Sequence, residues 1–130
     1  MAEAISVRNI TKTFPGVLAN DRVSIAIEKG EIRAIVGENG AGKTTLMKIL
    51  YGLYRPDSGE IRVKGENVKL SSARDAISKG IGMVHQHFML VPSFTLAQNI
   101  VLGVEPQKSV FIDEKALIEK VQGISEQYNL

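Results

Sequence analysis

One short stretch limits what this chain can fold into more than any other feature of the sequence. Residues 37–44 read Gly37-Glu38-Asn39-Gly40-Ala41-Gly42-Lys43-Thr44 and match the pattern G-x-x-x-x-G-K-S/T at every fixed position. The apolar run 32–36 leads into this stretch, and apolar residues at helical spacing follow it. This order predicts a strand, a tight glycine-rich loop and a helix, with the loop at the amino end of the helix.

A loop of this kind is suited to binding phosphate. The backbone N–H groups of residues 40–45 can surround an anion, and the positive end of the helix dipole points to the same place. Lys43 adds a positive charge for the β- and γ-phosphates, and the Thr44 hydroxyl is placed to ligate Mg²⁺. A glycine-rich turn that only caps a helix has no need of Lys and Thr at the helix entry. The stretch, hereafter the P-loop, therefore predicts a site for a nucleoside triphosphate and Mg²⁺, whose binding residues are Asn39, Gly40, Ala41, Gly42, Lys43, Thr44 and Thr45.

The rest of the chain carries strand signals first and helix signals later. Apolar and polar residues alternate over 5–10 and 23–27, which predicts antiparallel strands within the first 30 residues. Short strands are also expected at 61–63 and 81–84, and loops at 85–94 and 106–108. Three further helices are predicted: one capped by Ser71 or Ser72 and ending at Gly80, one capped by Thr95 and ending at Gly103, and a last one with Leu117, Val121, Ile124 and Tyr128 on one face. The class is α/β or α+β, built around one strand–loop–helix unit.

Composition excludes several other kinds of protein. The 130 residues are enough for one domain, and 44% hydrophobic with 23% charged residues is typical of a globular chain. The formal net charge of +2 is too small to indicate a nucleic-acid partner, and none is expected. Without cysteine, disulfides and Cys-based metal sites are excluded. No signal peptide and no run of 18 apolar residues is visible, so a soluble cytoplasmic protein is expected.

Three further stretches resemble the ATP-binding subunits of ABC transporters. They are residues 5–30, 52–61 and 82–86, and the resemblance extends over essentially the whole chain. Residues 83–92 and 94–100 are most similar to importers of simple sugars or nucleosides. The resemblance implies an α/β fold with a P-loop NTPase core, an antiparallel β-subdomain and the start of a helical subdomain.

The resemblance also implies two site residues outside the P-loop. Phe14 stands where the family places an aromatic that stacks on adenine; otherwise it is a core residue ahead of a turn. Gln86 matches the glutamine of the family's Q-loop, which contacts Mg²⁺ and the attacking water; otherwise it is a surface glutamine. The expected catalytic residues are then Lys43 and Gln86, and the expected metal ligands Thr44 and Gln86. His85 and His87 alone are too few for a zinc site.

The family's organisation divides residues 1–130 into four parts of one ATP-binding domain. Residues 1–30 are mainly antiparallel β, 31–54 the P-loop strand-loop-helix, 55–94 strands, a helix and the Q-loop, and 95–130 the start of the helical subdomain. A Ser-Gly-Gly-Gln-type signature loop and an apolar strand ending in Asp-Glu do not occur among the 130 residues. The expectation is a chain truncated before the signature loop, which binds nucleotide weakly and does not hydrolyse it.

The function implied is that of an ABC-type ATPase subunit coupling ATP binding and hydrolysis to import of a small solute, a simple sugar or a nucleoside. The implied partners are a second ATP-binding domain (a dimer mate or a tandem half), a transmembrane permease subunit contacted through residues 88–94 and, indirectly, a solute-binding protein. The implied location is the inner face of the cell membrane, as a peripheral cytoplasmic subunit. A non-transport ABC ATPase remains an alternative, as does a P-loop GTPase or nucleotide kinase. A GTPase would carry Asn-Lys-x-Asp, which is absent, and a kinase lid would be rich in arginine, whereas after the P-loop arginines are scattered at Arg55, Arg62 and Arg74.

Overall fold

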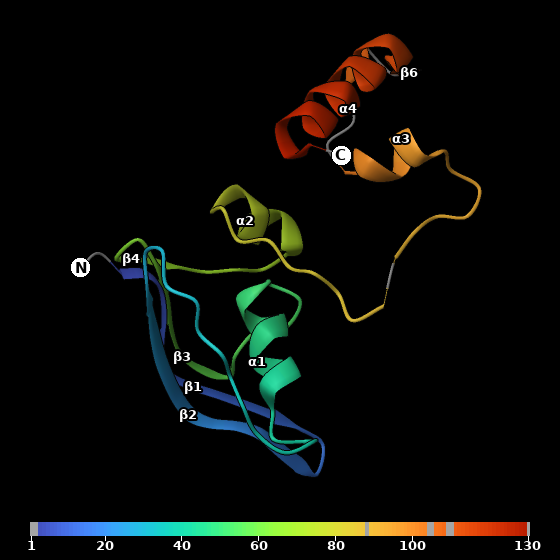
Figure 1. Ribbon diagram of the computed structural model, residues 1–130. Helices are drawn as coiled ribbons and strands as arrows, with labels where there is room; N and C mark the ends of the chain where they lie inside the picture. The colour runs from blue at the N-terminus through green and yellow to red at the C-terminus, as the bar shows by residue number, and fades with distance from the viewer. Residues whose placement is uncertain (1–2, 88, 104–105, 109–110, 130) are drawn as a thin grey trace. The chain divides into compact units, whose positions relative to one another are not determined.

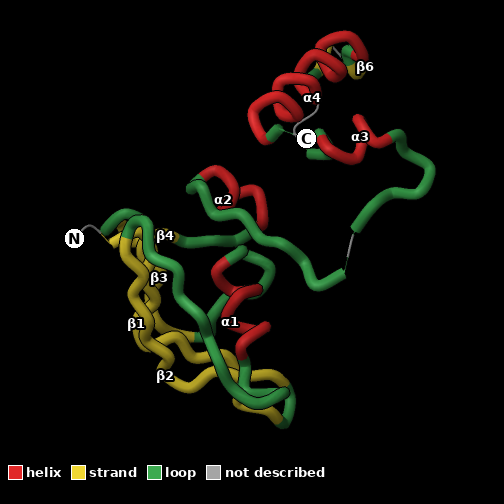
Figure 2. The backbone as a smooth tube through the Cα atoms, viewed as in Figure 1, coloured by secondary structure: helices red, strands yellow, loops and turns green. Residues whose placement is uncertain are grey.

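The computed structural model describes residues 3–87, 89–103, 106–108 and 111–129. The chain forms two compact units, Met1–Val84 and His85–Leu130. In the first unit a curved antiparallel sheet and two helices are joined by long loops, whereas the second unit is mainly helical (Figures 1 and 2). The predicted order of strands first and helices later is therefore confirmed.

The sheet of the first unit contains four antiparallel strands in the order β2-β1-β3-β4. The long strands β1 (Glu3–Phe14) and β2 (Val17–Glu28) form a hairpin. β3 (Ser58–Val63) pairs with the other edge of β1, and the short β4 (Glu66–Val68) pairs with β3. The strands predicted within residues 5–10, 23–27 and 61–63 are confirmed.

Two β-bulges face each other across the β1–β2 hairpin. Asn9 has φ 50° and Arg22 has φ 45°, and the register between the two strands shifts on either side of Ile10. Each bulge is held by a hydroxyl of the opposite strand: the Asn9 N–H donates to Ser24 Oγ (2.8 Å), and the Arg22 N–H donates to Thr11 Oγ1 (3.2 Å). Because a bulge inserts one extra residue, the face to which later side chains point is reversed beyond it.

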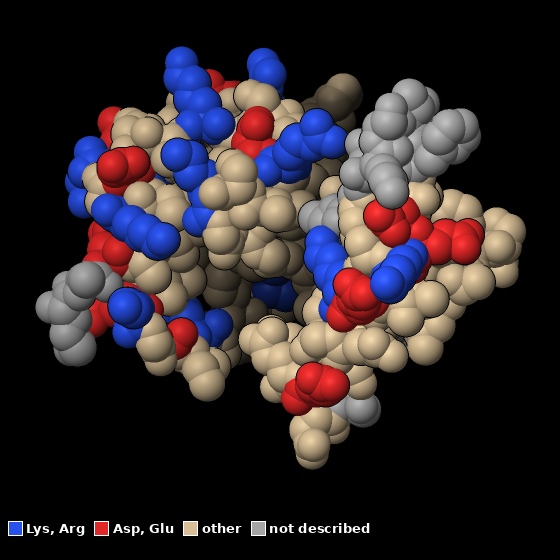
Figure 3. Space-filling model, turned by 90° about the horizontal axis from the view of Figure 1, so that it is seen from above, with Lys and Arg blue, Asp and Glu red and all other residues tan. Residues whose placement is uncertain are grey.

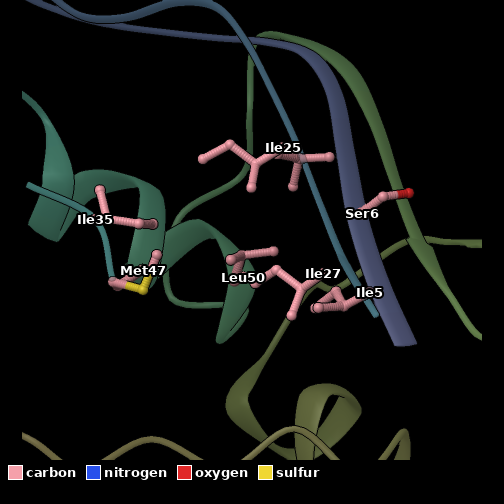
Figure 4. A pocket seen from close by; sticks show the side chains of 8 residues that line it. Ile5, Ser6, Ile25, Ile27, Ile35, Met47 and Leu50 are labelled. Carbon is pink, nitrogen blue, oxygen red and sulfur yellow. The ribbon is translucent and has the colours of Figure 1, made fainter. Parts of the chain in front are cut away.

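Helix α1 (Lys43–Leu50) covers the inner face of this sheet. Leu46 and Ile49 are buried against the apolar residues that the strands turn inward. A small cavity of about 20 Å³ remains between helix and sheet (Figure 4). Its apolar lining comes from both sides: Ile5, Val7, Ile25 and Ile27 from the strands, Met47 and Leu50 from α1, and Ile35 from the segment before the P-loop. The P-loop is thus attached to a helix that the core holds firmly.

Two strand predictions are wrong. Residues 32–36 and 81–84 are not paired with any strand among the residues that the structure describes. Ile35 and Ile81 pack against the core, but Ile32, Val36 and Val84 are more than nine-tenths exposed. An apolar run of this kind becomes a strand only when neighbouring strands accept its backbone hydrogen bonds and cover both faces. The P-loop is therefore preceded by an unpaired segment instead of the expected strand.

The predicted helix starts are confirmed by their caps. In α2 (Ala73–Ser78), the Asp75 N–H donates to the Ser72 side chain, and α3 (Leu96–Ile100) begins with a capping box of Thr95 and Gln98. The last helix, α4 (Glu114–Tyr128), is capped by Asp113. The loop expected at 106–108 is in part a strand, since β5 (Gln107–Lys108) pairs with β6 (Phe111–Ile112).

The second unit has a small core of its own, with Val101 and Leu117 buried. Throughout the part of the chain that the structure describes, each helix is too short or too polar to traverse a lipid bilayer.

Candidate functional site

The P-loop is an open, exposed loop between the unpaired segment and α1. Residues 37–41 are all exposed to solvent. The loop turns at two glycines with left-handed backbone, Gly40 (φ 86°) and Gly42 (φ 87°), and the Ala41 N–H donates to the Glu38 carbonyl (3.2 Å). Glycine adopts this left-handed backbone conformation without steric strain because it has no Cβ. The loop can therefore approach a ligand closely with its main chain.

The amino end of α1 is left without a protein cap. Gly42 is the N-cap and supplies no side chain, and the first turn contains no acidic residue. The first intrahelical bond is donated by Leu46 N–H to the Gly42 carbonyl (2.9 Å), so the N–H groups of Lys43, Thr44 and Thr45 have no acceptor within the helix. In the described part of the chain, α2, α3 and α4 each have a side-chain cap. The helix dipole and these free donors together favour an anion at this end of α1.

The Lys43 ammonium lies within the loop itself. Its Nζ donates to the carbonyl oxygens of Gly37 (2.6 Å) and Glu38 (2.7 Å). The side chain thus reaches back from the end of the loop and places its charge at the start of the loop. Exchanging these neutral carbonyl acceptors for phosphate oxygens would give the ammonium stronger, charge-assisted hydrogen bonds.

Strand β2 forms a wall behind the end of the loop. A Cβ added to Gly42 would lie 2.0 Å from the Ala19 carbonyl oxygen and 2.8 Å from Asn20 Nδ2. Asn20 is buried, and its Nδ2 donates to the Gly42 carbonyl (3.2 Å). Nothing in the sequence singles out Asn20, because its inward orientation depends on the bulge at Arg22. The far end of the β1–β2 hairpin and the P-loop accordingly lie together in Figure 1.

Phe14 ends β1 at the same end of the hairpin, two residues after Lys12, the partner of Asn20 in the ladder. Its ring meets Tyr54 edge-on, with ring centroids 5.3 Å apart, and the Lys12 Nζ lies 5.5 Å from its centroid. Phe14 is only half-buried, so part of the ring faces solvent. These contacts account for packing of the ring, while the adenine contact remains a prediction.

An ion pair next to Phe14 makes the hairpin sensitive to acid. The Lys12 ammonium (2.9 Å) and the Thr13 N–H (2.6 Å) both donate to the Asp57 carboxylate, and these bonds hold the pKa of Asp57 below its ordinary value. A carboxyl with a lowered folded-state pKa stabilises the fold above its unfolded pKa of about 4, and that contribution is lost as the pH falls through the folded pKa.

We therefore expect Asp57→Asn to lower the melting temperature at pH 6 to 7. The difference from the unmodified protein should shrink as the pH falls from about 4 through the lowered folded-state pKa of Asp57, because the carboxyl is then protonated and neutral like asparagine. Thermal melts followed by circular dichroism between pH 7 and 3 measure this. A difference that stays constant over the whole range would contradict the assignment, and Asp21→Asn, at an exposed pair with Arg22, is the matched control.

Gln86 lies in the second unit, in a bend after the segment 81–84. Its predicted roles in catalysis and metal binding therefore stay predictions. Of the expected permease surface at 88–94, Phe88 lies outside the described residues, whereas Met89 and Leu90 are exposed. Asn99 of α3 holds this loop: its Nδ2 donates to the carbonyls of Val91 (3.2 Å) and Thr95 (3.0 Å), and its Oδ1 accepts from the Val91 N–H (2.8 Å). The two apolar side chains are thus presented on a well-anchored loop.

The donors near the P-loop are compatible with Mg²⁺ in a nucleotide complex. No group of three or more His, Cys, Asp or Glu side chains that could hold a metal is found among the described residues. Mg²⁺ in nucleotide sites takes only one or two protein ligands and completes its shell with phosphate oxygens and water. The hydroxyl of Thr44, on the exposed first turn of α1, is a donor of this kind.

Comparison with known proteins gives a consistent result. The family model described as ABC transporter matches residues 20–129. The guanosine import ATP-binding protein NupO of Bacillus subtilis is 55% identical over 130 residues, which is 100% of this chain and 26% of that protein. The glucose import ATP-binding protein TsgD13 of Haloferax volcanii is 60% identical over 99 residues, 76% of this chain and 18% of that protein. The nucleoside import ATP-binding protein NupA of Lactococcus lactis is 49% identical over 126 residues, which is 97% of this chain and 25% of that protein.

Solved structures agree with these relatives. A nucleotide-free ATP-binding cassette from an ABC transporter superposes with a TM-score of 0.75 at 27% identity, covering 95% of this chain and 53% of that one. A second ATP-binding cassette of an ABC transporter gives a TM-score of 0.79 at 26% identity, covering 97% of this chain and 54% of that one. The chain spans about a quarter or less of the length of these three curated relatives and about half of the two solved cassettes.

Proposed function

The chain belongs to the ABC transporter family, and from that premise we propose that its P-loop binds the phosphates of ATP in complex with Mg²⁺. In this proposal the N–H groups of residues 40–45 and the Lys43 ammonium surround the phosphates. Thr44 holds the metal, and Phe14 stacks on the adenine. The resemblance to ATP-binding subunits, the open loop and the matching relatives all support this assignment.

The observation that carries the proposal is the uncapped amino end of α1. Three free N–H groups, the helix dipole and the Lys43 ammonium converge on one exposed loop, which has no acidic side chain in the helix's first turn to neutralise them. A phosphate group supplies both the negative charge and the oxygen acceptors that this end lacks. Phe14 lies at the end of the hairpin that backs the P-loop. In this proposal one nucleotide places its base against Phe14 and its phosphates in the P-loop.

Mg²⁺ would be held by the Thr44 hydroxyl together with phosphate oxygens, and Gln86 is proposed as its second protein ligand. The bound ion supplies neutralisation of charge on the β- and γ-phosphates. Lys43 and Gln86 are the residues proposed to act in hydrolysis, Lys43 by holding the γ-phosphate and Gln86 by orienting the attacking water.

The whole protein is proposed to couple ATP binding and hydrolysis to import of a small solute. The names of the relatives support a simple sugar or a nucleoside, because they describe import of guanosine, glucose and nucleosides. Its proposed partners are a second ATP-binding domain, a permease that contacts the exposed Met89 and Leu90, and indirectly a solute-binding protein. Its proposed place is the inner face of the cell membrane. Basic and acidic side chains are interspersed on the surface visible in Figure 3, and no nucleic acid is among the proposed partners.

Titration calorimetry with ATP and Mg²⁺ tests the proposed function, with GTP as a competing ligand. We expect ATP to bind, and inorganic tripolyphosphate to compete with it because the phosphates supply most of the contacts. A strong preference for GTP over ATP would contradict the proposal and favour a P-loop GTPase.

The adenine contact is tested by Phe14→Ala. Stacking of one base on an aromatic contributes about 1–3 kcal/mol, so ATP should bind about 5- to 150-fold more weakly while tripolyphosphate binding is unchanged. Phe14→Tyr keeps the ring and is the matched control, expected to bind ATP as the unmodified protein does. If Phe14→Ala lowers the melting temperature and leaves ATP affinity intact, the residue serves only to pack against Tyr54.

A further inference from the structure

The buried amide of Asn20 lies behind the P-loop, and the proposed function does not use it. Asn20 lies on β2 with 5% of its surface exposed, among residues that otherwise pack apolar side chains inward. Its Nδ2 donates to the Gly42 carbonyl, but its Oδ1 is buried without a hydrogen-bond partner in the described residues. An unpaired buried acceptor destabilises a fold, so packing alone would be better served by an apolar side chain at this position.

The bond from Asn20 acts on a particular peptide plane. Gly42 and Lys43 share a trans peptide, so the Gly42 carbonyl and the Lys43 N–H point in opposite directions. The carbonyl accepts from Leu46 N–H within α1 and from Asn20 Nδ2 across from β2. Holding the carbonyl toward β2 and the helix turns the Lys43 N–H the other way, out of the amino end of α1.

We infer that Asn20 is a positioning residue for the phosphate site: it fixes the Gly42–Lys43 peptide so that the Lys43 N–H is aimed at the bound phosphate. This inference rests on the proposed function, since it concerns the same loop. The ligand group concerned is the phosphate chain, while the base end of the nucleotide is left unaffected. The backbone contact of Gly42 with Ala19 places the loop against β2, and Asn20 adds the orientation of the peptide.

The test is Asn20→Leu, which removes the donor and keeps the number and branching of the side-chain heavy atoms. ATP should bind about three- to ten-fold more weakly, the loss expected for one neutral hydrogen bond. Adenosine, titrated by NMR, should bind unchanged. The melting temperature should stay level or rise, because the unpaired Oδ1 is removed as well. A residue with a merely structural role would show stability and both affinities falling together.

Ser6→Ala is the matched control. Among the described residues, Ser6 is also a buried polar residue of the sheet, but its Oγ donates to Glu3 Oε1 (2.6 Å) and not to the P-loop. It should lose some stability and keep its ATP affinity. Asn20→Ala repeats the test with a smaller side chain, in case leucine does not fit the site.

The outcomes separate the two claims. If the unmodified protein and Ser6→Ala bind ATP, and the folded Asn20 variants bind it equally tightly, the inference about Asn20 is overturned and the proposed function stands. If the unmodified protein does not bind ATP, the proposed function fails and the inference fails with it.

Discussion

Replacing Lys43 with alanine is expected to weaken binding of ATP and Mg²⁺ about 10- to 100-fold. The ammonium lies within the loop, 2.6 and 2.7 Å from the Gly37 and Glu38 carbonyls, where it can turn to the β- and γ-phosphates. A hydrogen bond to a charged group contributes about 1.5–3 kcal/mol, which corresponds to this range of affinities. Titration calorimetry measures the change.

Lys48→Ala provides the control for this experiment. Lys48 lies on the same helix, but its Nζ is placed over the Tyr54 ring at 5.4 Å. It should keep its ATP affinity, since its charge is directed to the ring and not to the loop. Equal loss of affinity in both variants would show that general positive charge, and not the position of Lys43, binds the nucleotide.

The second large effect is expected at Gly42. A non-glycine residue at φ 87° is strained by about 1–2 kcal/mol, and here the new Cβ would also lie 2.0 Å from the Ala19 carbonyl oxygen. Backbone cannot yield as a flexible side chain does, so the loop has to move off β2. Gly42→Ala should lower the free energy of unfolding by about 3 kcal/mol or more and largely abolish ATP binding.

Gly40→Ala separates the clash from the strain. Gly40 has nearly the same backbone angle, φ 86°, but apart from its two neighbours in the chain no residue has an atom within 4 Å of the position its Cβ would take. Only the strain of about 1–2 kcal/mol is expected there. Chemical denaturation of both variants measures the difference, and equal destabilisation would show that the contact between Gly42 and β2 is unimportant.

Local signals in the sequence predicted most of the elements correctly. Ser72 and Thr95 were recognisable as helix caps because a capping hydroxyl acts within three residues of chain. The alternation of Ile25 and Ile27 with polar neighbours likewise indicated a strand that is buried on one face. These elements depend on neighbours in sequence, so the sequence is sufficient to locate them.

Strands whose pairing partners are distant in the sequence were harder to predict from the sequence. The apolar runs 32–36 and 81–84 read as strands, yet no strand pairs with them among the described residues. The short pair β5–β6 appeared only in the structure, since Gln107 and Lys108 carry no strong strand signal. In each case the deciding factor is whether another segment accepts the backbone hydrogen bonds, which local pattern does not encode.

The candidate site shows the same division. The pattern of residues 37–44 alone determined a glycine-rich loop, a lysine and a hydroxyl at the start of a helix, because these residue types at this spacing suit phosphate. Only the tertiary structure decided what stands behind that loop. The bulge at Arg22, held by Thr11, reverses the alternation of β2 and turns Asn20 inward to the Gly42 carbonyl. Such a bulge arises from pairing between two strands. The face of the sheet to which a side chain points therefore depends on the partner strand as much as on the residue's own strand.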